Sequence, residues 1–82
     1  MDDQKNLEMN LGSPSDMALL MLQARIAKGF SQQEVADNAD AYRPYISRME
    51  TNDIHLPYLE RFFDTMKMCG VTLTATFENK AE

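Results

Sequence analysis

Few residues of this chain could perform covalent or metal chemistry. Its 82 residues include one cysteine, Cys69, and one histidine, His55. A nucleophile needs a nearby base and a zinc site needs three or four ligands, so neither can be assembled. Cys69 falls in an apolar helical stripe, where we expect burial. His55 falls in a loop, where a polar role or a phosphate contact is expected. The sequence therefore predicts no enzyme, no cofactor and no metal.

Two arginines offer a binding chemistry instead. Arg43 and Arg48 lie in the segment RPYISRME, whose apolar residues Ile46 and Met49 are spaced for one helical face. The arginines therefore fall on the outer side of that helix. A guanidinium group can bond two acceptors at once, such as those on the edge of a guanine base.

These arginines are positioned by the stretch from Gly29 to Glu50, which predicts two short helices. Ser31 and Glu34 form a capping-box pattern, so the first helix begins at about Ser31. Residues 38–41 interrupt the period with residues that tolerate turns, and Pro44 suits the first turn of the second helix. The small residues Ala36 and Ala39 allow the two helices to cross closely. The stretch is thus predicted to be a helix-turn-helix unit.

The segments GFSQQEVA and RPYISRME resemble the helix-turn-helix domain of the Cro/cI-type (xenobiotic-response-element) repressors, over roughly residues 17–71. The resemblance implies a mainly α, five-helix domain whose second motif helix enters the major groove of double-stranded DNA. It also implies a homodimer that reads a palindromic operator. The chain is most similar to the HipB-type antitoxins, including the Ser13-Pro14 opening. The expected function is therefore a sequence-specific repressor that autoregulates a toxin–antitoxin operon, with a kinase-like or nuclease-like toxin as a further partner.

The resemblance also assigns roles to individual residues. The side chains expected to face base edges are Tyr42, Arg43, Pro44, Tyr45 and Arg48. The side chains expected to contact DNA phosphates are Lys28, Ser31, Gln32 and Ser47. Arg25 and Glu50 are expected to form a structural ion pair. The chain departs from the family pattern at Asp40, in place of the turn glycine, and at Tyr42, in place of a capping hydroxyl residue.

The flanking segments divide the chain into three parts. Residues 1–12 are expected to be a flexible arm, and pairing with another strand is the alternative. Residues 13–70 form the helical domain, with a first helix over 13–28 and a last helix over 57–70. Phe30 is expected to anchor the core. The first helix carries two apolar stripes, and we leave open whether the second is buried or contacts another protein.

Residues 71–82 form the third part, a strand followed by a tail. Apolar and polar residues alternate strictly here, and the apolar face consists of Val71, Leu73, Ala75 and Phe77. A single strand would leave its backbone groups unpaired. We therefore expect this strand to pair with its copy across the two-fold axis of a homodimer.

The length and composition indicate one small domain and limit the functions that it could have. The net charge is −5, which argues against nonspecific DNA binding, since that relies on a basic face. No membrane-spanning or signal-peptide pattern is present, so the cytoplasm is the expected compartment. The alternatives are a protein-interaction module, such as an antitoxin or adaptor with weak or no DNA binding, and a phage-type regulator.

Overall fold

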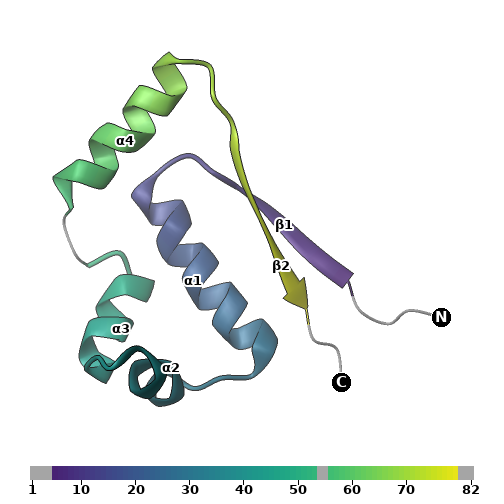
Figure 1. Ribbon diagram of the computed structural model, residues 1–82, viewed down its shortest axis with the longest axis vertical. Helices are drawn as coiled ribbons and strands as arrows, with labels where there is room; N and C mark the ends of the chain where they lie inside the picture. The colour runs from purple at the N-terminus through teal and green to yellow at the C-terminus, as the bar shows by residue number, and fades with distance from the viewer. Residues whose placement is uncertain (1–4, 54–55, 80–82) are drawn as a thin grey trace.

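The computed structural model describes residues 5–53 and 56–79, which form four helices and two strands (Figure 1). The elements in chain order are β1 (Lys5–Leu11), α1 (Pro14–Lys28), α2 (Gln32–Ala39), α3 (Arg43–Glu50), α4 (Pro57–Met68) and β2 (Leu73–Asn79). The expectation of five helices is wrong for the described residues. The described residues form four helices, and the alternating segment after α4 forms the strand that its sequence predicted, so no described segment remains for a fifth helix.

The long helix α1 begins and ends at the residues that its sequence indicates. Ser13 caps its first turn by accepting a hydrogen bond from the backbone N–H of Asp16 at 3.2 Å. Gly29 ends the helix in the left-handed conformation, with φ of 79°, which a residue without a Cβ adopts at little cost. Because both ends are fixed, α1 is a stable platform for the shorter elements.

The strand β2 pairs with β1 of the same chain, which corrects the expected pairing across a homodimer. The two strands are antiparallel, in a register that runs from Lys5 opposite Asn79 to Leu11 opposite Leu73. Residues 5–11 are therefore a strand and not a flexible arm. A flexible arm was expected because the apolar residues of this segment are few and polar residues separate them, but the alternative, pairing with another strand, is the one observed.

Val71 does not belong to the strand for which it was predicted. Its backbone N–H instead donates to the carbonyl of Met66 at 2.9 Å, while the N–H of Gly70 donates to Lys67 at 3.1 Å. These two bonds close the carboxyl end of α4, with Gly70 at a φ of 73°. The strand begins two residues later, at Leu73.

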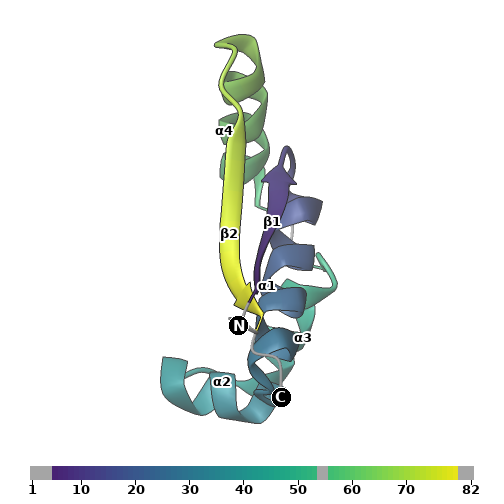
Figure 2. The same ribbon diagram turned by 90° about the vertical axis from the view of Figure 1, so that its right-hand side faces the viewer.

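The molecule is a thin plate with a small core. Its principal extents are 40, 36 and 17 Å, and Figure 2 shows it edge-on. Among the described residues, the buried apolar side chains are Ala18, Ala36, Ile46 and Phe63. Phe30 and Cys69, which were expected to be buried, are both exposed. They lie near the ends of helices, where the thin plate provides no second layer to cover them.

The helix α4 stands apart from the helix-turn-helix end of the molecule (Figure 1). It contacts the rest of the chain mainly through α1. Between them an open apolar groove of about 320 Å³ is lined by residues from α1, α3 and α4.

His55 lies outside the described residues. No helix in the described part of the chain has the length and apolar character needed to cross a membrane.

Candidate nucleic-acid interface

The helices α2 and α3 pack against each other as the helix-turn-helix prediction requires. Ser31 and Glu34 form the complete capping box, with the two bonds at 2.7 and 3.0 Å. Ala36 is fully buried, and its small side chain lets the two helices approach closely. Asp40 makes the turn in the left-handed conformation, with φ of 56°, so it replaces the expected glycine without loss of the turn.

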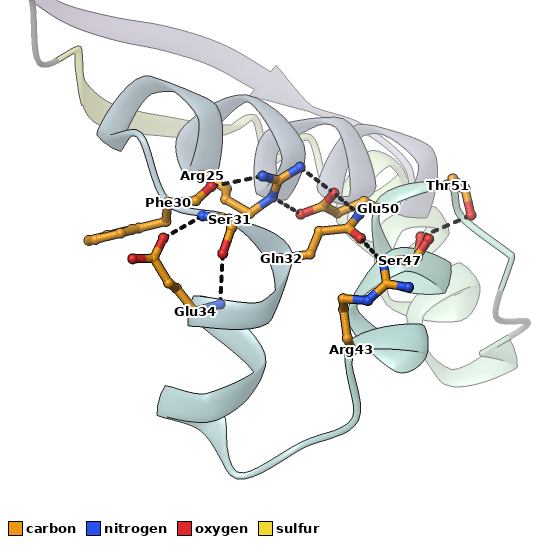
Figure 3. A network of polar contacts seen from close by, with 9 residues as sticks. All are labelled: Arg25, Phe30, Ser31, Gln32, Glu34, Arg43, Ser47, Glu50 and Thr51. Atoms are coloured by element: carbon orange, nitrogen blue, oxygen red, sulfur yellow. Dashed lines mark hydrogen bonds and ion pairs between the residues drawn. The ribbon is translucent and has the colours of Figure 1, made fainter.

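A hydrogen-bond network around Glu50 fixes α3 to α1 and α2 (Figure 3). Arg25 donates to the Glu50 carboxylate from Nε at 2.6 Å and from Nη2 at 3.0 Å, which is the ion pair that the sequence predicted. Gln32 donates to the same carboxylate at 3.0 Å. The carboxylate is buried, with only 2% of the side chain exposed. Its three donors make the burial of a charge tolerable.

The same contacts determine the ionisation of the pair. Hydrogen bonding from Arg25 lowers the pKa of Glu50, against the opposing effect of burial, and Gln32 adds to the lowering. Hydrogen bonding to Glu50 correspondingly raises the pKa of Arg25. Both groups are thus charged at neutral pH, and Arg25 also donates from Nη1 to the carbonyl of Phe30 at 2.8 Å. The pair is a scaffold that sets the position of α3.

The outward face of α3 carries the residues expected to reach base edges. Ile46 and Glu50 point into the molecule, and both are buried. Successive residues of a helix turn by about 100°, so Pro44 and Arg48 lie on the opposite side. Both are exposed, and the Arg48 side chain forms no hydrogen bond with any residue that the structure describes. Arg48 is therefore available to bind an external acceptor.

The other expected base-contacting residues are placed differently. Arg43 is exposed, but its Nη1 donates to the Gln32 side chain at 3.1 Å. Tyr42 precedes α3, makes no capping bond and is 84% exposed. Tyr45 is half exposed and lines the groove beside α1. Tyr42 and Arg43 are thus accessible from outside. To contact a base, Arg43 would have to give up its exposed hydrogen bond to Gln32.

The residues expected to contact phosphates are mostly engaged within the chain. Ser31 accepts the capping bond from the Glu34 backbone, and both polar atoms of the Gln32 amide are bonded. Lys28 pairs with Glu78 of β2 at 2.7 Å, and both side chains are largely exposed. Ser47 is half-buried. The exposed Lys28 pair could open towards a phosphate at little cost in stability.

Gln32 occupies a bridging position that was not expected from the sequence. Its amide accepts from Arg43 and donates to Glu50, so one side chain joins the exposed face of α3 to the buried ion pair. The helical periodicity of α2 places Gln32 in the first turn but says nothing about its partner. Pairing between a side chain and a residue 18 positions away depends on the crossing of α2 and α3, which no local pattern specifies.

Neither a group of metal ligands nor a similar protein helps to assign a function to this site. Within the described residues, no group of three or more His, Cys, Asp or Glu side chains is placed to hold a metal ion. Comparisons of the chain with protein-family models, with curated proteins and with solved structures find no match.

Proposed function

We propose that the chain is a sequence-specific DNA-binding repressor that acts as a homodimer. The observation that carries the proposal is the outward face of α3, where Arg48 is exposed and unbonded within the described residues while Glu50 anchors the opposite side. A rigid helix that presents a free guanidinium suits bidentate binding to a guanine in the major groove. The fixed backbone limits the conformational freedom that binding would remove.

The charge distribution favours reading of bases over general attraction to phosphate. The chain carries a net charge of −5, and Lys28, one of its few cations near α2, is already paired with Glu78. Counterion release, which drives nonspecific binding, would therefore be small. Selectivity would depend on a few contacts from α3, with a low affinity for unrelated sequences.

Substitution of Arg48 tests the proposal. Duplexes bound by the wild-type chain would be selected from a random-sequence pool and compared with the region upstream of the chain's own gene. We expect Arg48→Ala to reduce discrimination between the selected duplex and random DNA by about 1–3 kcal/mol per half-site. Arg61→Ala, which removes an exposed arginine of α4, is the matched control and should bind like wild type. Equal loss in both variants, or no selected duplex, would contradict the proposal.

The antitoxin role is a further part of the proposal. Its support is the resemblance of GFSQQEVA and RPYISRME to the HipB-type antitoxins, which implies that the repressor controls its own operon and neutralises a toxin. An adjacent gene for a kinase-like or nuclease-like protein, and co-purification of its product with this chain, would support that role. An adjacent integrase gene would favour a phage-type regulator instead.

A protein-interaction module is the second candidate, because the chain combines a net charge of −5 with an open apolar groove. A gel shift with the upstream region separates the two functions. A retarded band that persists over excess random DNA supports the repressor, and its absence supports the module.

A further inference from the structure

The chain exposes more surface than a folded monomer of its size. Its accessible surface is 6212 Å², whereas a monomer of 9.4 kDa is expected to expose about 5,000 Å². Its radius of gyration is 14.3 Å, against about 11.7 Å for a compact domain of this length. A standard protein–protein interface covers about 800 Å² on each partner. The excess of about 1,200 Å² is larger than the surface that one partner buries in such an interface, so the chain exposes enough surface to form one.

The shape of the molecule shows where a covering layer is missing. Two packed layers of helices need about 20 Å, because one helix with its side chains is 10–12 Å across. The molecule is 17 Å thick, and α4 lies beside α1 instead of above it (Figures 1 and 2). The groove between them exposes apolar side chains that have no second layer. Such a face needs another protein surface to remove it from water.

The groove is apolar along its length and continues on to α3. Met17, Leu20 and Met21 line it from α1, Leu59 from α4, and Tyr45 and Met49 from α3. Met17 is 39% exposed at its edge. Because α3 forms one wall, a partner bound in this groove would contact the helix that carries Arg48.

The chemistry of the lining favours a second copy of this chain over a charged partner. None of the described residues that line the groove is acidic or basic, so a basic protein would find no charge complementarity there. Two copies of an acidic chain could approach through this uncharged surface with little mutual repulsion. The exposed Phe62 of α4 is further apolar surface that a second copy could bring to this groove in a symmetric pair.

We infer that a second copy of this chain docks in the groove between α1 and α4, so that this helical face is the homodimer interface. The inference deepens the proposed function, because it names the surface that would join the two subunits. It leaves the pairing of β1 with β2 inside each chain unchanged. Each subunit would cover the apolar face that the other exposes.

The test compares a charge placed in the groove with the same charge placed outside it. Met17→Glu alters the groove, and Ile26→Glu alters an exposed apolar residue of the same helix that does not line it. Sedimentation equilibrium without DNA measures the dimer dissociation constant of each variant. We expect wild type and Ile26→Glu to have twice the chain mass of 9.4 kDa, and Met17→Glu to dimerise roughly 30-fold or more weakly.

Additional measurements keep the test informative if one variant folds poorly. Circular dichroism should give all three proteins the same helical content, and Met17→Gln, which adds no charge, should weaken the dimer less than Met17→Glu. A monomeric wild type, or equal weakening by the substitutions at Met17 and Ile26, would overturn the inference. Because the readout contains no DNA, these outcomes are separate from a failure of Arg48→Ala to change DNA discrimination.

Discussion

Neutralising Glu50 should destabilise the fold far more than neutralising an exposed acid. Glu50→Gln retains the size of the side chain but removes the charge that accepts two hydrogen bonds from Arg25, at 2.6 and 3.0 Å. The Arg25 side chain is only 15% exposed, so water cannot fully replace the lost partner. Breaking a buried pair in this way costs about 3–5 kcal/mol. A domain of this length has a free energy of unfolding of about 4–12 kcal/mol, so the loss would be severe.

Glu78→Gln provides the matched control. It removes the partner of Lys28 in an ion pair whose side chains are 42% and 57% exposed, so the loss should be under about 1 kcal/mol. Urea denaturation at a single chain concentration, followed by circular dichroism, measures both free energies of unfolding. If the two variants differ by less than about 0.5 kcal/mol, the reasoning about burial is wrong.

The same pair predicts a dependence of stability on pH. The pKa of Glu50 is lower in the folded chain than its unfolded value of about 4.3, because Arg25 stabilises the carboxylate. The contribution of the Glu50 carboxylate to the free energy of unfolding is fully present above that unfolded pKa. It disappears as the pH falls through the folded pKa. Wild type should therefore lose more unfolding free energy than Glu50→Gln between about pH 5 and pH 2. Equal losses of unfolding free energy in the two proteins would mean that the pKa of Glu50 does not change on folding.

Changes at three further places test other parts of the fold. Ser31→Ala removes the cap of α2 and should lower the free energy of unfolding by about 1 kcal/mol, measured by urea denaturation. Asp40→Gly should be neutral or stabilising by up to about 1 kcal/mol, whereas Asp40→Val should destabilise, because the φ of 56° suits glycine and opposes a β-branched residue. Deletion of residues 1–11 removes the partner of β2 and should abolish protection of the β2 amides in hydrogen exchange; retained protection would mean that β2 pairs elsewhere.

Local patterns predicted the helices well because their ends carry their own signals. Ser13, Gly29 and the Ser31–Glu34 box each fix a terminus through contacts within four residues. The Arg25–Glu50 pair, 25 residues apart, was expected only through the resemblance and not from any local pattern. In the structure this pair links α1 to α3.

The parts that sequence reasoning missed depend on pairing over long distances. The partner of β2 lies at the opposite end of the chain, and the alternation at Leu7, Met9 and Leu11 was too short to identify it as a strand. The exposure of Phe30 and Cys69 follows from the thin plate, because an apolar residue is buried only where another layer covers it. Helical spacing shows which residues share a face but not what lies opposite.

The spacing of the bound half-sites tests most directly whether two copies of α3 read one duplex. The selected duplex would be compared with a version in which about five base pairs, or half a helical turn, are inserted between its half-sites. If a symmetric pair presents two Arg48 side chains to one side of the duplex, the insertion turns one half-site away and should reduce the affinity to that of a single half-site. Equal affinity for the two duplexes would contradict reading by a symmetric pair.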